Sequence, residues 1–332
     1  MADSAAGTSP VGWDWTKWWT TQRRNIAYSF GTVVLLVIIG GILKPGILSG
    51  SSLSVLAELA SFVGFVGVGQ TLVFLLGGID FSVVWVLNAG AILIAVESAA
   101  GNGSLPGALA ITLGMGLAVG LANGIGVAYF SIPAIVMTLG ANGIGEGLSL
   151  GLSGGLTCNT CKDPPAPALL TGLNGKLAGV PGDVLVWVGV ILLVSLLLSG
   201  STFGRRIYAT GVNPAASYLA GVGIRGVTVA VYALSGLFAA VAGIMLAANS
   251  GGASLGLGNP YLLESIAAAV IGGVSVLGGR GHYVGTVAGC LTLVVLVAIL
   301  NAELIPDYVR SIVYGAVIIV IVLLYGREKQ VA

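Results

Sequence analysis

Few side chains in this sequence can do chemistry, and most of them are carboxylates set in long apolar stretches. Asp80 directly follows Gly77-Gly78-Ile79, between two apolar runs. Glu146 stands inside another run, and Glu264 follows the pair Asn259-Pro260. A carboxylate at lipid depth costs on the order of 3 kcal/mol or more unless it is paired, hydrogen-bonded or wet. Such carboxylates therefore anchor structure or contact a polar solute.

Each of these polar side chains has two interpretations. Asp80 either lines a pathway or caps the next helix, and Glu264 either contacts a solute or is stabilised in a first helical turn by the helix dipole. Asn88 and Asn123 offer amides to solute hydroxyl groups or to a neighbouring helix. Glu146 is expected to face the interior of a helix bundle, because lipid does not solvate a carboxylate.

The constellations that mark an enzyme are missing. The only histidine, His282, has no Ser-His-Asp arrangement around it, and no Walker phosphate loop is present. Cys158 and Cys161 form one C-x-x-C without the second ligand pair of a zinc site. A disulfide in an extracytoplasmic loop and two free thiols both remain open. We expect no catalytic residue, no metal site and no cofactor bound by this chain.

The composition identifies the solvent. Of 332 residues, 56% are hydrophobic and only 8% are charged, against roughly 25% charged residues in a soluble domain. The mean hydropathy is +1.04. Lipid must therefore surround most of the surface. The 54 glycines suit close packing of membrane helices, and a net charge of +1 gives no reason to expect nucleic acid as a partner.

The apolar runs are too long for barrel strands and predict an all-α membrane protein. We expect about ten transmembrane helices. They cover residues 26–43, 55–76, 82–100, 107–128, 132–152, 184–199, 227–249, 262–278, 283–301 and 309–325.

Around one transmembrane domain, 26–328, lie three segments of different character. Residues 1–25 cluster Trp and basic residues, which favours a short cytoplasmic, interfacial segment. Residues 153–183 are expected to form an extracytoplasmic loop, and residues 200–225 a cytoplasmic one. With both termini cytoplasmic, nine basic residues fall inside and four outside, in agreement with the positive-inside rule.

A weak internal sequence similarity suggests a repeat. The stretch 77–82 has a Gly-rich counterpart in 272–279, and each follows an apolar run. If spans two to five repeat as spans seven to ten, the two copies are five spans apart. Because successive spans cross the membrane in opposite directions, an odd number of spans inverts the second copy relative to the first. Inverted repeats with Gly-interrupted helices are a recurrent architecture of transporters.

Four segments, in order, carry a family resemblance. The blocks are Gly69-Gln70-Thr71-Leu72-Val73 with 77–83, Asn123-Gly124 with 132–140, 204–221, and 261–281 with its Gly-Gly-Arg-Gly. Together they resemble the permease subunits of ribose/galactoside-type (monosaccharide) ABC importers, over roughly residues 26–328.

The resemblance implies the function and the partners. The chain would translocate a monosaccharide or similar polyhydroxylated solute across a bacterial plasma (inner) membrane. It would pair with a second permease copy or a paralogue, with an extracytoplasmic solute-binding protein, and with cytoplasmic ABC ATPase subunits that hold ATP and Mg. The alternative is a secondary transporter driven by an ion gradient.

The resemblance also assigns 204–221 as the segment that docks on the ATPase. Asn213-Pro214 fits a helix start, with Asn as N-cap and Pro at the first position. The docking candidates are Arg205, Arg206, Asn213, Ala215, Ala216 and Gly221. The sequence departs from the family at Glu146, where a basic residue is usual, and at Trp85, whose indole would narrow a cavity that it faced.

Overall fold

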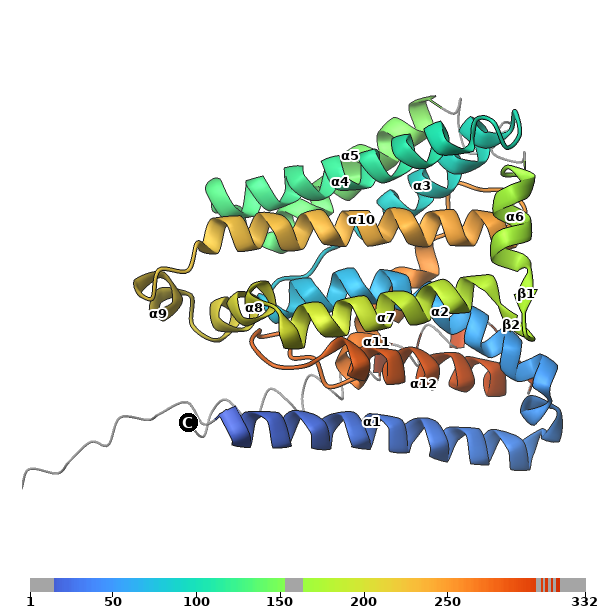
Figure 1. Cartoon of the computed structure of the whole chain (residues 1–332), viewed down its shortest axis with the longest axis horizontal. Helices are drawn as coiled ribbons and strands as arrows, with labels where there is room; N and C mark the ends of the chain where they lie inside the picture. Colours follow the sequence, from blue (N-terminus) through green and yellow to red (C-terminus); the bar gives the residue numbers. More distant parts are fainter. Residues whose placement is uncertain are drawn as a thin grey trace, which may run out of the picture.

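The computed structural model describes residues 15–152 and 164–302, together with residues 306, 308, 309, 312, 315 and 316. This part is almost entirely helical (Figure 1). Its helices are α1 (Trp15–Leu43), α2 (Gly50–Leu75), α3 (Val83–Ser98), α4 (Leu105–Tyr129), α5 (Ala134–Leu152), α6 (Pro167–Asn174), α7 (Gly182–Gly200), α8 (Thr202–Val212), α9 (Pro214–Leu219), α10 (Ile224–Ser250), α11 (Asn259–Ile271) and α12 (Tyr283–Ala302). A 3-10 turn, η1 (Pro45–Leu48), and an antiparallel pair, β1 (Lys176–Leu177) with β2 (Val180–Pro181), complete it.

The all-α membrane fold agrees with the sequence. In the described part, seven helices are long and apolar enough to cross a membrane: α1, α2, α4, α5, α7, α10 and α12. Two further predicted spans overlap shorter helices, α3 of 16 residues and α11 of 13. At 1.5 Å per residue these are about 24 and 20 Å long, short of the ~30 Å hydrocarbon core. The predicted span 262–278 is too long, because α11 ends at Ile271 and residues 272–278 form a loop. Most of the predicted span 309–325 lies outside the described residues.

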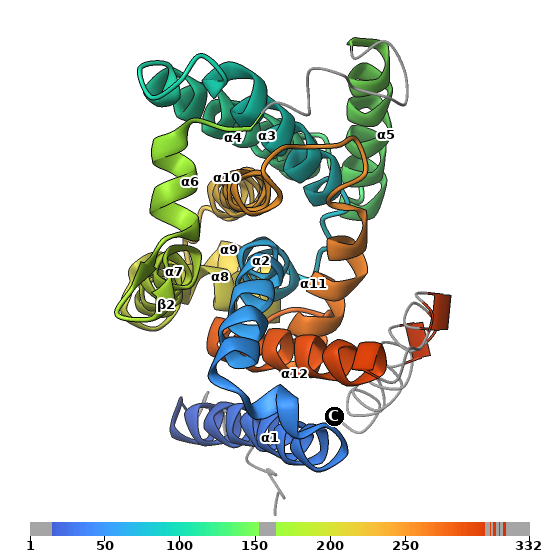
Figure 2. The same cartoon turned by 90° about the vertical axis from the view of Figure 1, so that its right-hand side faces the viewer.

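The helices form a centre and a periphery. α2 lies in the middle of the bundle, between α10 and α12 on two sides and α7 and α11 on the others (Figure 2). In its most apolar stretch α10 is 72% buried, whereas α1 and α5 are only 11% buried. The peripheral helices therefore present apolar surface outward, as lipid requires.

Glycine brings α4 and α10 into backbone contact. A Cβ at Gly116 or Gly120 would overlap the carbonyl oxygen of Gly236 or Tyr232, and one at Gly124 would lie 2.7 Å from Val229 Cα. The three glycines recur every four residues, so they share one face of α4. Close backbone approach through small residues is how helices pack without a hydrophobic driving force.

The three segments predicted outside the transmembrane helices fold in different ways. Residues 15–25 run into the first span as one helix, α1, so they do not form a separate surface helix. The loop 200–225 folds as the short helices α8 and α9, of which α9 protrudes at one end of the molecule (Figure 1). The loop 153–183 contains α6 and the β1–β2 pair at the other end. Cys158 and Cys161 lie outside the described residues.

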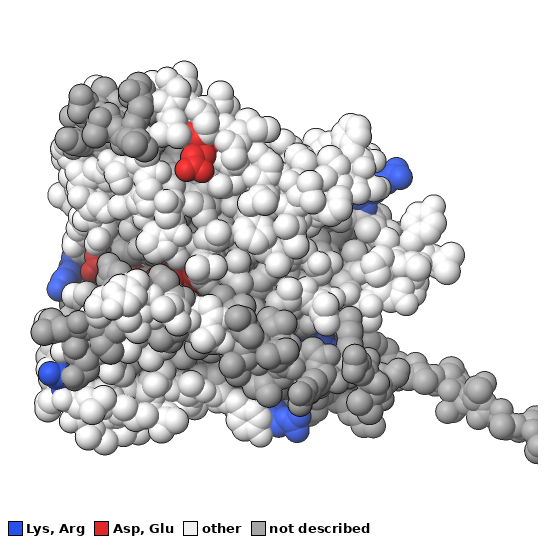
Figure 3. Space-filling model, turned by 180° about the vertical axis from the view of Figure 1, so that it is seen from behind, with Lys and Arg blue, Asp and Glu red and all other residues white. Residues whose placement is uncertain are grey.

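Charged side chains are few on the described surface of the molecule. On the face in Figure 3, basic side chains lie at both ends of the molecule and at the lower edge, a carboxylate patch lies on the upper part, and most of the remaining described surface is uncharged. A surface with so few charged side chains fits a bilayer-spanning protein.

Candidate functional site

The link between α2 and α3, residues 76–82, is the first part of the candidate site. α2 ends in a Gly C-cap: Gly77 has φ +81° and donates to Phe74 O (2.8 Å), and Gly78 donates to Val73 O (3.1 Å). This pair of bonds is a Schellman motif, which closes a helix and turns the chain away from its axis. The chain then folds back into the bundle before α3 begins (Figure 1).

Asp80 in this link is fully buried and hydrogen-bonded. Its Oδ1 accepts from the backbone N–H (2.9 Å) and the hydroxyl (2.6 Å) of Ser82, and its Oδ2 accepts from the hydroxyl of Ser235 on α10 (2.7 Å). Gln70 of α2 donates to the Asp80 carbonyl oxygen (2.6 Å). Asn123 of α4 donates to Ser82 Oγ (2.8 Å). The hydrogen bonds of Asp80 and Ser82 together therefore connect α2, the start of α3, α4 and α10.

This geometry favours the anchoring interpretation of Asp80 and Asn123. The Ser82 N–H that Asp80 accepts lies at the start of α3, where a carboxylate also gains from the helix dipole. Both side chains are completely buried. Gln70 and Ser235 were missed as members of this network, because nothing in the sequence indicates that α10 approaches Asp80.

Asn88 likewise connects helices. Its Nδ2 donates to Asn259 Oδ1 (3.2 Å), and its Oδ1 accepts from the N–H of Gly258 (2.6 Å), directly before α11. Asn88 is only 6% exposed. It thus ties the two short helices α3 and α11 together, as the helix-to-helix alternative predicted.

Trp85 connects α3 to α5 through two hydrogen bonds. Its backbone N–H donates to Asn142 Oδ1 (3.2 Å), and its indole N–H donates to Ser149 Oγ (2.9 Å). The ring fills the space that a side chain at Gly145 would occupy. Trp85 therefore works as a packing residue between α3 and α5.

The expectation that Glu146 faces the bundle interior is wrong. Glu146 is exposed on the surface of the described chain. The physical reason is its neighbour: Gly145 is the residue of α5 that packs on Trp85, and the next residue of a helix points about 100° away. Glu146 therefore lies on the uncovered side of α5.

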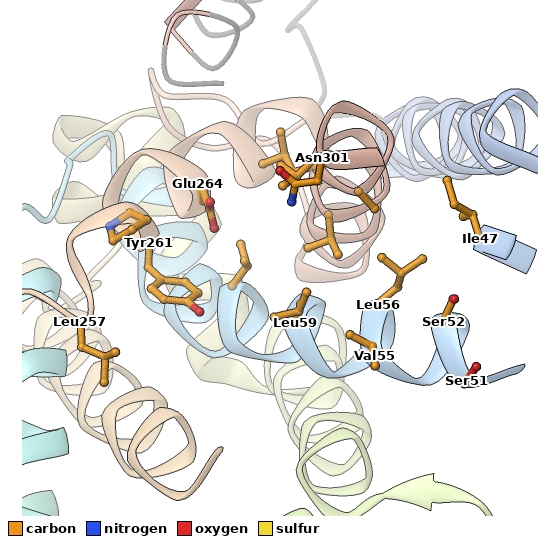
Figure 4. Close-up of a pocket in the computed structure, with 16 residues that line it drawn as sticks. Ile47, Ser51, Ser52, Val55, Leu56, Leu59, Leu257, Tyr261, Glu264 and Asn301 are labelled. Carbon is orange, nitrogen blue, oxygen red and sulfur yellow. The ribbon is translucent and has the colours of Figure 1, made fainter. Parts of the chain in front are cut away.

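An open cleft of about 690 Å³ lies between α2, α11 and α12. Side chains from the three helices surround it (Figure 4), and Tyr261, Glu264 and Asn301 supply polar groups beside a mostly aliphatic wall. Its lining residues are Ile47, Ser51, Ser52, Val55, Leu56, Leu59, Val63, Leu257, Pro260, Tyr261, Glu264, Leu293, Val294, Val297, Ala298 and Asn301. Of the predicted solute contacts, only Glu264 lies here. Tyr261 and Asn301 were missed, although Tyr261 is one helical turn from Glu264.

At the other end of the molecule, the short helix α8 packs against the bundle and α9 protrudes from it. Asn213 caps α9 as predicted: its Oδ1 accepts from the N–H of Ala216 (3.0 Å), and Pro214 is the first helical residue. Tyr218 is 73% exposed and Leu219 is 86% exposed. Large exposed apolar side chains on a protruding polar end are typical of a protein contact.

The remaining docking candidates surround this tip. Ala215, Ala216, Arg205 and Arg206 are all exposed. Gly221 has φ +80°, so it ends α9 in a conformation that favours glycine. A bulky residue at Gly221 would strain the turn itself, which makes the exposed positions of α9 the better test of docking.

His282 is buried at this end, not exposed as a loop residue would be. The N–H of Val284 donates to Nδ1 (3.2 Å), and Nε2 lies 2.9 Å from Ser199 Oγ. Since Nδ1 accepts, Nε2 carries the proton and donates to Ser199. The neutral imidazole therefore ties the start of α12 to the end of α7.

We predict that acid weakens the protein through His282. Burial lowers the pKa of His282 to about 4, so between pH 6.5 and 4 the unfolded chain binds a proton that the folded chain does not. Stability is complete above pH 6.5 and falls by about 3 kcal/mol as the pH drops to 4. Melting temperatures in detergent across this range, compared with His282→Gln, measure the effect. An equally steep acid slope in the variant would contradict it.

The described part of the chain contains no group of three or more His, Cys, Asp and Glu residues that could hold a metal ion. Cys290, placed within α12, is buried and free.

The whole chain is similar to permease proteins. Residues 52–322 match the family described as "Branched-chain amino acid transport system / permease component". The chain is 35% identical over 300 residues to the autoinducer 2 import system permease protein LsrC of Escherichia coli O9:H4 (strain HS), covering 90% of this chain and 85% of that protein. It is 32% identical over 316 residues to the ribose import permease protein RbsC of Escherichia coli (strain K12), covering 95% and 96%. No solved structure matches.

These matches extend over both the candidate site and the transmembrane helices, and they confirm the resemblance that the four motifs carry. The chain belongs to the family of branched-chain amino acid transport system permease components, and it is a multi-pass transport subunit similar to the permeases of ribose and autoinducer 2 import systems.

Proposed function

We propose that this chain is the membrane permease of an ABC importer that carries a monosaccharide or a similar polyhydroxylated solute into a bacterial cell. The single observation that supports this most is the similarity along 95% of the chain to a permease named for ribose import. ATP and Mg would be held by partner ATPase subunits, and a solute-binding protein would deliver the cargo. The similarity supports this function over an ion-coupled transporter.

We place α8 and α9 on the cytoplasmic side, where α9 docks on the ATPase. Arg205, Arg206 and Arg225 belong to this end of the molecule, whereas Lys44 and Lys176 belong to the opposite end. This asymmetry follows the positive-inside rule. Both termini would then be cytoplasmic, in a protein of ten transmembrane segments.

A second permease chain would cover the outer side of α5. Lipid does not solvate a carboxylate, so the exposed Glu146 needs a polar or protein environment. Leu139, two helical turns before Glu146 on the same face of α5, is 54% exposed and supplies apolar contact area. A homodimer or a pair with a paralogue, meeting at this face, would satisfy both.

We propose that the inverted repeat pairs α2–α3–α4 with α10–α11–α12. The stretches 77–82 and 272–279 meet at one end of the molecule, since Gly279 N–H donates to Leu75 O (2.9 Å), so they are not each other's inverted copies. The better partner of Gly77-Gly78 is Gly251-Gly252: Gly251 has φ +66°, and Gly252 donates to Ala247 O (3.1 Å), five residues back, as Gly78 does to Val73. Each pair precedes a short helix, α3 or α11.

The cleft chemistry favours a neutral cargo. Its polar groups are a carboxylate, a phenol, an amide and two hydroxyls, and no Lys or Arg lines its described walls. Hydroxyl groups of a sugar can donate to Glu264 and pair with Asn301, while the Tyr261 ring covers an apolar sugar face. A free amino acid would bring a carboxylate for which the described walls of the cleft offer no Lys or Arg partner.

Proteoliposomes that contain the chain, its ATPase and its binding protein test this proposal. We expect uptake of a neutral sugar such as ribose and not of leucine. Glu264→Gln should reduce sugar uptake about tenfold, whereas Ser51→Ala at the rim should change it less than twofold. Uptake of leucine alone, or wild-type sugar uptake by Glu264→Gln, would contradict the assignment of the cleft.

A further inference from the structure

Two helix ends finish in the same way at the α8 end of the molecule. After α2, Gly77 has φ +81° and donates to Phe74 O. After α11, Gly273 has φ +81° and donates to Val270 O (2.9 Å), and Val274 donates to Ala269 O (2.9 Å). Both are Schellman motifs, so each helix stops abruptly and leaves its last carbonyls near a neighbouring backbone.

The last turn of α8 touches the end of α2 and the loop that follows α11. A Cβ at Gly211 would overlap the carbonyl oxygen of Leu75, which is the last residue of α2. The same Cβ would lie 2.6 Å from the backbone nitrogen of Gly279. Gly279 in turn donates to Leu75 O (2.9 Å). Three backbones therefore meet at one point without a side chain between them.

Tyr208, one turn earlier on α8, fixes the second contact. Its buried hydroxyl donates to Gly281 O (2.7 Å) in the loop between α11 and α12. That loop is folded back on itself, because Ser275 N–H donates to Arg280 O (2.9 Å). A displacement of α8 is thus passed to the α11–α12 loop through a hydrogen bond, and to α2 through direct backbone contact.

The same helices form the walls of the cleft at the far end. α2 supplies Val55 and Leu59, and α11 supplies Tyr261 and Glu264. Helices are stiff over this length, so a rotation at the inner end of α2 or α11 changes the width of the cleft at the outer end. Close backbone packing has few alternative arrangements, which makes such a junction behave as a switch between discrete states.

We propose that Tyr208 and Gly211 are positioning residues that join the docking helix α9 to α2 and to the loop between α11 and α12 at once, so that the α2 wall and the α11 wall of the cleft respond together to the ATPase. This inference rests on the proposed function. It assigns a role to backbone contacts inside the chain, separate from the exposed surface of α9 that meets the partner.

The test compares Tyr208→Phe and Gly211→Ala with Gly226→Ala, a glycine of α10 with open space around it. Tyr208→Phe removes one hydroxyl and keeps the ring, so it folds even if Gly211→Ala does not. In proteoliposomes with the ATPase and binding protein, we measure ATP hydrolysed per solute imported, and co-purification of the ATPase.

We expect normal co-purification in all variants, a ratio of ATP to solute raised about threefold by Tyr208→Phe and about tenfold by Gly211→Ala, and no change with Gly226→Ala. A wild-type ratio in Tyr208→Phe would overturn the positioning role while leaving the proposed function intact. Absence of nucleotide-dependent uptake in the unmodified protein would overturn the proposed function and this inference with it.

Discussion

Asp80→Ala is expected to abolish uptake and to lower the melting temperature of the purified protein by roughly 5 °C or more. The substitution leaves the Ser82 N–H, the Ser82 hydroxyl and the Ser235 hydroxyl without their acceptor in a buried site. Each buried group that loses its partner costs about 1–3 kcal/mol. Thermal unfolding in detergent, followed by uptake in proteoliposomes, measures both effects.

Asp80→Asn is the matched control, because an amide keeps the shape without the charge. Its oxygen can accept from the Ser82 N–H, and its NH₂ group can donate to Ser235 Oγ. If Asp80 is an anchor, Asp80→Asn should stay within about 1 kcal/mol of the unmodified protein and keep most of its uptake. Loss of uptake in Asp80→Asn with unchanged stability would show that the charge itself is needed, and would contradict the anchoring role.

Leu219→Asp is expected to separate the permease from its ATPase without unfolding it. Leu219 is 86% exposed at the tip of α9, so a charge there adds no burial penalty in the isolated chain. In a complex, the same charge would be buried in an apolar contact, which costs several kcal/mol. We expect at least a tenfold loss of ATPase co-purification and of uptake, at an unchanged melting temperature.

Leu177→Asp provides the control for this experiment. Leu177 is 71% exposed on β1, at the opposite end of the molecule. The same change there should leave ATPase binding intact. Ala216→Arg, on the exposed surface of α9, should behave like Leu219→Asp. Equal ATPase binding by all three variants would rule out α9 as the docking surface.

The helices could be predicted from the sequence because residues that face lipid must be apolar. Nine of the predicted spans overlap helices, including the short α3 and α11. The cap of α9 was equally clear, since Asn213-Pro214 is a local signal that depends on its own backbone. Local hydrogen-bonding patterns of this kind need no knowledge of tertiary contacts.

The partners of the polar side chains could not be predicted from the sequence, because they come from distant parts of the chain. Ser235 meets Asp80 across 155 positions of sequence, and Asn259 meets Asn88 across 171. The orientation of Glu146 depends on Gly145 packing against Trp85, which hydropathy does not encode. A carboxylate in an apolar run therefore indicates importance, while its role needs the geometry.

The glycine pairs illustrate the same limit. Sequence spacing alone matched Gly77-Gly78 with the stretch 272–279, yet these segments lie together at one end of the molecule. Inversion requires opposite ends, a condition that Gly251 at the far end of α10 can meet. Composition recognises a helix break, and only the fold shows at which surface the break lies.

In our proposal, another subunit supplies the energy for import through this chain. Accumulation of labelled ribose, or of the ligand identified for the binding protein, in proteoliposomes with and without the ATPase tests this energy source. We expect accumulation above the external concentration only when the ATPase, ATP and Mg, and the binding protein are all present. Vesicles that fill to the same level without the ATPase would contradict it.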